Sequence, residues 1–397
     1  KYGDTLRVKE QLYTAEHRSA ARAIASETFV LLKNENHLLP LGLKGKIALV
    51  GPMADARNNM CGMWSMACTA SRHGTLLEGI RSAAGDKAEI LYAKGSNVYE
   101  DAEMEKAAAG IRPLEHEDNR KLLDEALRVA SRADVIVAAL GECAEMSGES
   151  ASRTSLEIPD AQQDLLKALV KTGKPVVLLL FTGRPLVLNW EDANVHSILN
   201  VWFGGSETGD AVADVLFGKI TPSGKLTTTF PRSVGQLPLF YNHLNTGRPD
   251  PDSHIFNRYA SNYLDESNEP LYPFGYGLSY TDFVYGELQI SSETLPKNGE
   301  LTVSVTVTNK GNYDGYETVQ LYLHDIYAEI ARPVKELKGF ERVFLKSGES
   351  RDVKFVITED DLKFYNSELH YVYEPGEFDV MVGPNSRDVQ TKSFQAK

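Results

Sequence analysis

The stretch Asp134-Val-Ile-Val-Ala-Ala-Leu140 is a short apolar run, and a loop rich in carboxylates follows it. Because every position after Asp134 is apolar, the run is typical of a strand that is covered on both faces of a sheet. Four more such strands are expected, at 46–50, 88–93, 175–181 and 197–203. Helical patterning predicts helices over 14–32, 122–131 and 159–171. This alternation predicts an α/β sandwich with a mostly parallel sheet.

The second half of the chain has a different periodicity. Apolar and polar residues alternate over 301–307, 318–323, 352–357 and 377–382. Turn-forming segments with a glycine separate these runs, which predicts an antiparallel β-sandwich of immunoglobulin-like type. We therefore expect an α/β domain over 1–240, an aromatic, Pro/Gly-rich connecting strap over 241–284, and the β-sandwich over 285–397.

Composition limits the classes of partner. The chain has 397 residues, a length that suits two or three domains, and a formal net charge of −13. This acidic balance argues against a nucleic-acid partner, because such binding depends on Lys and Arg. No apolar run approaches the roughly 18 residues of a membrane-spanning helix, so no membrane partner is expected.

The loop after the 134–140 strand holds the densest group of polar residues. It contains three carboxylates, Glu142, Glu145 and Glu149, with Gly148 before the last of them and Arg153 at its end. Ligands of parallel sheets bind beyond the carboxyl ends of the strands, where partial burial suits a carboxyl group to general acid catalysis. A solvated acidic loop is the commoner explanation of such a composition. Composition does not choose among the three glutamates.

The loop after the first strand contains Cys61, Trp64 and Cys68. Trp64 stands among small and polar residues and could be a stacking platform, although a single tryptophan is more often packed in a core. Cys61 and Cys68 could pair within the loop, but their spacing is not diagnostic. It matches no zinc pattern, and no histidine is found at ligand spacing nearby, so no metal site is expected.

Two other functional classes lack their signatures. The segment 204–209 is glycine-rich and precedes a helix, but it has no lysine of the Walker type, which argues against a nucleotide-binding protein. The Gly-x-Ser-x-Gly motif of the α/β-hydrolases does not occur.

Long stretches of the chain match, in order, the motifs of one known family. They include Ser26-Glu-Thr-Phe-Val-Leu-Leu-Lys-Asn34, Val50-Gly-Pro-Met-Ala-Asp55, Ser147-Gly-Glu-Ser-Ala-Ser-Arg153, Tyr272-Pro-Phe-Gly-Tyr-Gly-Leu-Ser-Tyr280 and Arg332-Pro-Val-Lys-Glu-Leu-Lys-Gly-Phe340. On these motifs the sequence resembles glycoside hydrolase family three from about Thr14 onward. It is most similar to the bacterial periplasmic β-glucosidases of that family.

The resemblance implies a barrel, an α/β sandwich and a fibronectin type III-like domain, of which this sequence corresponds to the last two. It implies that Glu149 is the catalytic acid/base and that Arg153 and Trp64 lie at the substrate. The family's nucleophile is an aspartate of the barrel. We therefore expect this chain to be inactive alone, and a barrel domain from the same precursor or a separate chain to complete the site.

The expected activity is hydrolysis of terminal non-reducing β-D-glucosyl residues with retention, by two carboxyl groups about 5–5.5 Å apart. The partner is then a β-glucoside or oligosaccharide, and no cofactor is needed. Alternatives are a β-xylosidase or exo-glucanase of the same family, or a non-catalytic carbohydrate-binding module. The resemblance also implies a periplasmic or secreted location, and homodimers occur among relatives.

Overall fold

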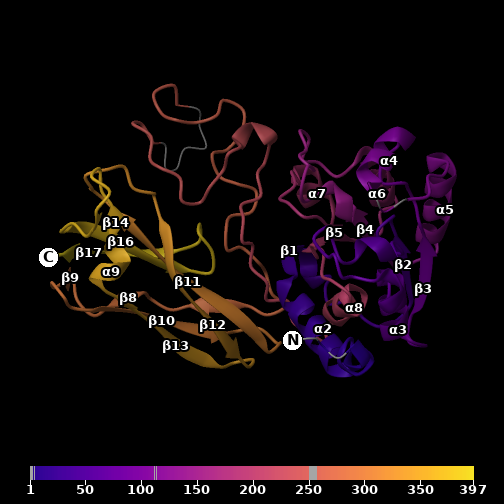
Figure 1. Cartoon of the computed structure of the whole chain (residues 1–397), viewed down its shortest axis with the longest axis horizontal. Helices are drawn as coiled ribbons and strands as arrows, with labels where there is room; N and C mark the ends of the chain where they lie inside the picture. The colour runs from indigo at the N-terminus through magenta and orange to yellow at the C-terminus, as the bar shows by residue number, and fades with distance from the viewer. Residues whose placement is uncertain (1–2, 4, 111, 113, 250–256) are drawn as a thin grey trace. The chain divides into compact units, whose positions relative to one another are not determined.

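The computed structural model describes residues 3, 5–110, 112, 114–249 and 257–397. The chain divides into two compact units, Lys1–Gly224 and Lys225–Lys397 (Figure 1). The segment 241–284, predicted to be a connecting strap, belongs to the second unit, and its residues 250–256 lie outside the described residues. None of the helices in the described ranges has the length and apolar character needed to cross a membrane.

The first unit is built on a six-stranded sheet with the order β1-β6-β5-β4-β2-β3. All neighbours in the sheet are parallel except β1 and β6, which are antiparallel. The strands are β1 Val30–Asn34, β2 Lys46–Val50, β3 Glu89–Ala93, β4 Val135–Gly141, β5 Val176–Phe181 and β6 Ser197–Asn200. The predicted α/β sandwich with a mostly parallel sheet is therefore confirmed.

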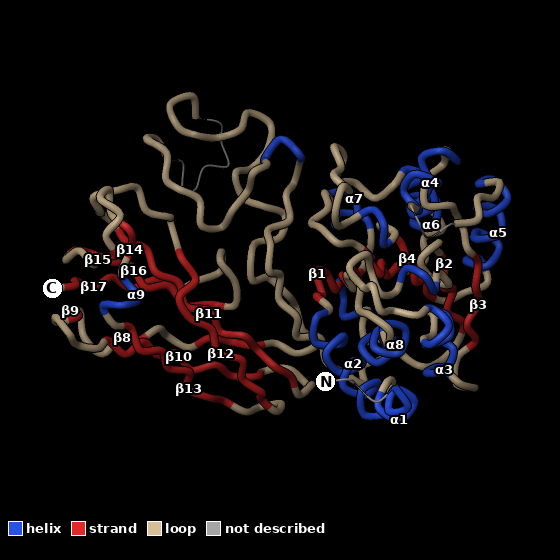
Figure 2. The backbone as a smooth tube through the Cα atoms, viewed as in Figure 1, coloured by secondary structure: helices blue, strands red, loops and turns tan. Residues whose placement is uncertain are grey.

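Helices cover both faces of this sheet, with α3 and α8 on one side and α5 and α6 on the other (Figure 2). The α-helices of the first unit are α1 Val8–Gln11, α2 Ala15–Thr28, α3 Leu76–Ala84, α4 Ala102–Ala109, α5 Asn119–Ser131, α6 Asp160–Val170, α7 Asn189–Asn194 and α8 Thr208–Leu216. The caps follow from the sequence: Thr75 and Glu78 form a capping box at the start of α3.

Two predicted elements in the first unit end several residues earlier than expected. The helix expected over 14–32 ends at Thr28, and its last residues belong to β1, because Val30, Leu31 and Leu32 form a fully buried strand beside β6. The strand expected over 197–203 ends at Asn200, because the backbone turns away at Trp202, which has a φ of 50°.

The second unit is a sandwich of two antiparallel sheets, with one parallel pair, β9 and β17, at an edge. One sheet has the order β13-β10-β7, with β8 also paired to β10, and the other has the order β12-β11-β16-β17-β9. A separate pair, β14 Phe364–Tyr365 and β15 Tyr371–Val372, and a helix, α9 Glu359–Leu362, complete the unit. The main strands are β7 Phe283–Tyr285, β8 Gln289–Ile290, β9 Thr294–Leu295, β10 Leu301–Asn309, β11 Gly315–Asp325, β12 Glu336–Leu345, β13 Ser350–Ile357, β16 Gly376–Gly383 and β17 Gln390–Ala396.

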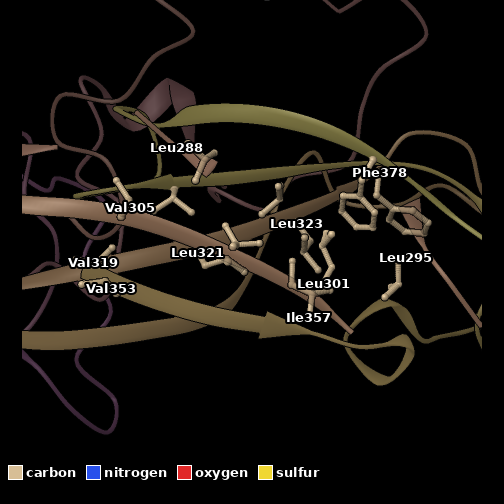
Figure 3. Packing of buried hydrophobic residues seen from close by; sticks show 14 of the residues in the cluster. Leu288, Leu295, Leu301, Val305, Val319, Leu321, Leu323, Val353, Ile357 and Phe378 are labelled. Atoms are coloured by element: carbon tan, nitrogen blue, oxygen red, sulfur yellow. The ribbon is translucent and has the colours of Figure 1, made fainter. Parts of the chain in front are cut away.

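The alternating residues of these strands form the core of the sandwich (Figure 3). Leu301, Val303, Val305 and Val307 all point inward from β10 and are at most 3% exposed. The four predicted strands are confirmed, and each lies inside a longer observed strand. The sequence pattern missed β12, in which the first seven residues are only partly buried or exposed.

One buried acidic side chain of the first unit, that of Glu191, forms no ion pair with the described residues. Glu191 on α7 is 1% exposed, and Gln163 Nε2 donates a 2.7 Å hydrogen bond to its Oε1. Burial raises the pKa of Glu191 from the ordinary 4.5 to about 7. The folded state therefore retains a proton that the unfolded state has already released, and stability decreases as pH rises between these two values.

We expect Glu191→Gln to remove this pH dependence, because the amide stays neutral and can still accept the bond from Gln163. At about pH 8 the variant should be more stable than the parent by up to about 3 kcal/mol, and at about pH 4 the two should be equal. Denaturant unfolding of both proteins at the two pH values measures the difference. A difference that does not change with pH would contradict the buried, neutral Glu191.

Candidate active site

Three loops meet at the carboxyl edge of the first unit's sheet, because β2, β4 and β5 are neighbours there. They are the loops that follow Val50, Gly141 and Phe181. Gly141 closes β4 with a φ of +130°, and a Cβ at this position would lie 1.9 Å from the carbonyl oxygen of Phe181. The sequence therefore turns tightly into the acidic loop next to the end of β5.

Glu142, the first acid of the loop, is held in a buried ion network. Its side chain is 0% exposed. Arg153 Nη1 lies 2.8 Å and Arg184 Nε 3.1 Å from Oε1, while the hydroxyl of Thr182 and the amide of Gly183 donate to Oε2 at 2.8 and 3.2 Å. Both carboxylate oxygens are thus used inside the protein. Glu142 has no oxygen left for a substrate.

Glu145, the second acid, pairs with Arg112, whose Nε lies 3.0 Å from its Oε1. Their side chains are 7% and 18% exposed. Arg112 Nη1 also donates to the carbonyl oxygens of Asn58 and Gly62, at 3.1 and 2.9 Å. This arginine therefore links the loop after β4 to the loop after β2.

Glu149, the third acid, is exposed and makes no hydrogen bond or ion pair with any residue that the structure describes. Its two neighbours have left-handed backbone: φ is +105° at Gly148 and 58° at Ser150. A serine in this conformation costs on the order of 1 kcal/mol, and such outliers gather at functional sites. Of the three acids, Glu149 alone is free to act on a ligand.

Arg184 fixes the segment that presents Glu149. Besides contacting Glu142, it donates through Nη2 to the carbonyl oxygens of Met146 and Ala151, the latter at 2.7 Å. These two carbonyls stand on either side of Glu149 in the sequence. Arg184 was not among the predicted site residues, and its only signal in the sequence is the segment Gly183-Arg-Pro185, which follows β5 after Thr182.

Trp64 is 70% exposed, so the alternative that it packs in the core is wrong. A Cβ added to Gly148 would lie 3.1 Å from Trp64 Nε1 and 2.8 Å from Met63 Cγ. The tryptophan loop therefore lies directly against the residue that precedes Glu149. Arg153, in contrast, is bound to Glu142 and to the carbonyl oxygen of Glu157, at 3.0 Å.

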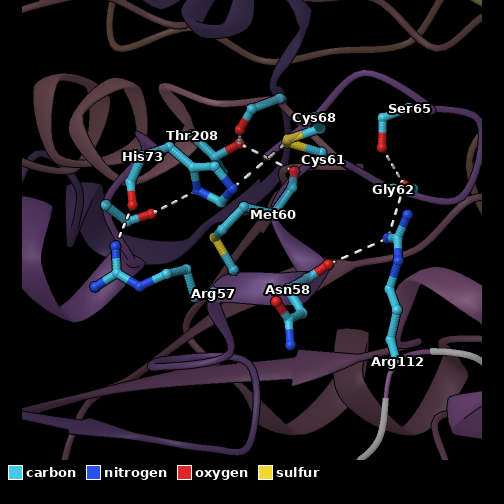
Figure 4. The surroundings of a disulfide bond; sticks show 12 residues. Arg57, Asn58, Met60, Cys61, Gly62, Ser65, Cys68, His73, Arg112 and Thr208 are labelled. Carbon is cyan, nitrogen blue, oxygen red and sulfur yellow. Dashed lines mark hydrogen bonds between the residues drawn. A yellow bond between two sulfur atoms is a disulfide. The ribbon is translucent and has the colours of Figure 1, made fainter. Parts of the chain in front are cut away.

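Cys61 and Cys68 form a disulfide (Figure 4), which settles the question that their spacing left open. The buried side chain of His73 lies beside it, with Nε2 3.8 Å from Cys61 Sγ and Nδ1 3.2 Å from the carbonyl oxygen of Gly74. The expectation that no histidine stands at ligand spacing near the two cysteines is wrong, because the turn through Ala70–Arg72 brings His73 back to them. In the described part of the chain this is the one cluster of three side chains that could hold a metal ion, and its two sulfurs are bonded to each other.

Residues 29–280 match the Glycosyl hydrolase family 3 C-terminal domain, and residues 317–386 match a Fibronectin type III-like domain. The chain is 48% identical over 386 residues to a periplasmic beta-glucosidase of Salmonella typhimurium, which covers 96% of this chain and 50% of that protein. It is 37% identical over 392 residues to a beta-xylosidase of Formosa agariphila, which covers 97% of this chain and 51% of that protein.

Among solved structures, a β-glucosidase from Listeria innocua in complex with isofagomine matches with a TM-score of 0.86 and 39% identity. The match covers 100% of this chain and 52% of that one. The chain spans about half the length of the curated relatives it matches. The match to the family's domain covers more than half of the chain. The chain therefore belongs to glycoside hydrolase family three.

Proposed function

We propose that this chain carries the acid/base half of a retaining β-glucosidase, with Glu149 as the acid/base. The observation that carries the proposal is the difference between the three acids of one loop. Glu142 and Glu145 are buried in pairs with arginines, whereas Glu149 is exposed and unpaired at the carboxyl edge of the sheet. A general acid must reach the leaving-group oxygen, and only Glu149 can do so.

In the proposed reaction, Glu149 first donates its proton to the glycosidic oxygen as the bond to the leaving group breaks. The second carboxyl group, an aspartate on a barrel domain, attacks the anomeric carbon and forms a glycosyl-enzyme. Glu149, now a carboxylate, takes a proton from the water that hydrolyses this intermediate. Because the nucleophile lies on the barrel, the residues described here do not complete the reaction alone.

The other two predicted site residues take different parts in this proposal. Trp64 offers an exposed aromatic face beside the Glu149 loop, where it can stack on the leaving-group ring. Arg153 acts through Glu142 as a positioning residue, because its guanidinium is already bound there. Its assignment as a direct substrate contact stays a prediction.

The substrate is proposed to be a terminal β-D-glucosyl residue, supported by the names of the Salmonella and Listeria relatives. A β-xyloside is the second candidate, because a beta-xylosidase of Formosa agariphila is also similar. A periplasmic or secreted location is supported by the Salmonella relative's name and by the disulfide, since disulfides persist in oxidising compartments. The ratio of kcat/KM for 4-nitrophenyl β-glucoside and β-xyloside decides between the two sugars.

In the complete enzyme, Glu149→Ala should lower kcat/KM for substrates with a poor leaving group by about 10²- to 10⁴-fold. Substrates with an activated leaving group need no protonation, so they should still form the glycosyl-enzyme, and azide should then release it as a glycosyl azide. Glu157→Ala, which removes another exposed carboxylate of the same loop region, is the matched control and should behave like the parent. Absence of azide rescue would exclude Glu149 as the acid/base.

Glu142→Gln should give a different result. Removing one charge from the buried network leaves two arginines without their carboxylate, so we expect a loss of about 3–5 kcal/mol in the free energy of unfolding. Activity should fall without any azide rescue, because Glu149 is still present. Chemical unfolding and product analysis with azide separate the two variants. Azide rescue in Glu142→Gln would mean that the acids have been assigned in the wrong order.

The chain purified alone should not hydrolyse an aryl β-glucoside, and adding the family's barrel domain, fused or separate, should produce turnover. Release of nitrophenol by the chain alone, followed by absorbance and abolished by Glu149→Ala, would contradict the need for a second domain.

A further inference from the structure

The Cys61–Cys68 disulfide closes a ring of the chain that contains Trp64. The two cysteines are 7 positions apart in sequence, and their Cα atoms are 6.5 Å apart. Both cysteine side chains are partly buried, whereas Trp64 and Met66 inside the ring are 70% and 94% exposed. The ring therefore presents the side chains of Trp64 and Met66 outward, beside the Glu149 loop.

The first side of the ring is anchored to the body of the unit (Figure 4). The carbonyl oxygen of Met60 accepts from the amide of Gly205 and from the hydroxyl of Thr208, at 3.1 and 3.4 Å. Arg112 binds the carbonyl oxygens of Asn58 and Gly62. The chain is thus fixed up to Gly62, two residues before Trp64.

The second side of the ring has few anchors of its own. Residues 63–68 are all described, and their hydrogen bonds to other described residues run from the Ser65 hydroxyl to the carbonyl oxygen of Gly62, at 2.6 Å, and from the Cys68 amide to the carbonyl oxygen of Ser65, at 3.0 Å. Both bonds lie inside the ring. Apart from the main chain itself, the disulfide is therefore the covalent link that ties the outer side of the ring to its anchored side.

We propose that the Cys61–Cys68 disulfide positions Trp64 as the platform for the leaving-group ring, so that the redox state of this pair sets affinity for substrates with a ring-bearing leaving group. The proposal rests on the proposed function, because it needs Glu149 to mark where the leaving group lies. Without the bond, the ring gains conformations in which the indole no longer lies against Gly148. Trp64 is then no longer preorganised for the leaving-group ring, and ordering it on binding lowers the affinity.

The switching step is a two-electron reduction by a dithiol. One thiolate of the reductant attacks a sulfur of the disulfide and forms a mixed disulfide, and the second thiolate releases the protein thiol. The protein gains two electrons and two protons, and the reductant leaves as its own disulfide. Cys143 does not take part in this thiol–disulfide exchange, because it is buried and burial raises the pKa of its thiol to about 12.

The test compares two substrates of the complete enzyme: an aryl β-glucoside and β-glucosyl fluoride, whose leaving group has no ring. The double variant Cys61→Ser, Cys68→Ser should raise KM for the aryl glucoside by about tenfold, because one aromatic stacking contact is lost. Its kcat/KM for the fluoride should be unchanged. Treating the parent with a dithiol should give the same change, reoxidation should reverse it, and the double variant should not respond to the dithiol.

Equal changes for both substrates would show a general loosening of the fold and overturn the proposal, as would no change for either. The variant Trp64→Ala distinguishes a failure of this proposal from a failure of the proposed function. If Trp64→Ala raises the aryl glucoside KM and the double cysteine variant does not, the disulfide has no positioning role. If Trp64→Ala has no effect while Glu149→Ala still shows azide rescue, the Trp64 platform fails and the acid/base assignment stands.

Discussion

A carboxylate that is buried away from water must be stabilised by positive charges and hydrogen-bond donors of the protein instead. The surroundings of Glu142 follow from this requirement. Its Oε1 contacts both Arg153, from the far end of the acidic loop, and Arg184, from the loop after β5. Arg184 then has donors left for Met146 and Ala151. The path of the chain around Glu149 follows from how one buried charge is neutralised.

The same logic explains the second acid. Glu145 is nearly as buried, and Arg112 reaches it from a segment more than thirty residues earlier in the chain. Because Arg112 also binds two carbonyl oxygens of the tryptophan loop, the pairing that neutralises Glu145 joins the two loops that carry Trp64 and Glu149. The ion pairs of Glu142 and Glu145 thus hold the loop in place, and this fixes the position of Glu149.

The sequence predicted an element correctly where the hydrophobic pattern of one continuous segment determines its structure. Continuous apolar runs predicted the strands of the parallel sheet, and period-two alternation predicted the core of the sandwich. β1 was missed because Val30-Leu-Leu32 continues a helix-like pattern, and its strand state depends on pairing with β6 across the chain. The roles of Glu142, Glu145 and Glu149 could not be separated from composition, because the difference lies in distant arginines. The exposure of Trp64 could not be predicted either, because the accessibility of a residue depends on distant segments that pack over it.

The contacts that fix the acidic loop have a further consequence for how such enzymes diversify. Asn59, Arg112, Thr182 and Arg184, which hold this loop, all belong to the first unit. On the proposed function, substitutions in another domain that change sugar recognition would therefore leave the position of Glu149 unchanged. On the same proposal, one unchanged acid/base loop would serve both a β-glucosidase and a β-xylosidase, the activities named for the two relatives above, while sugar specificity changes elsewhere.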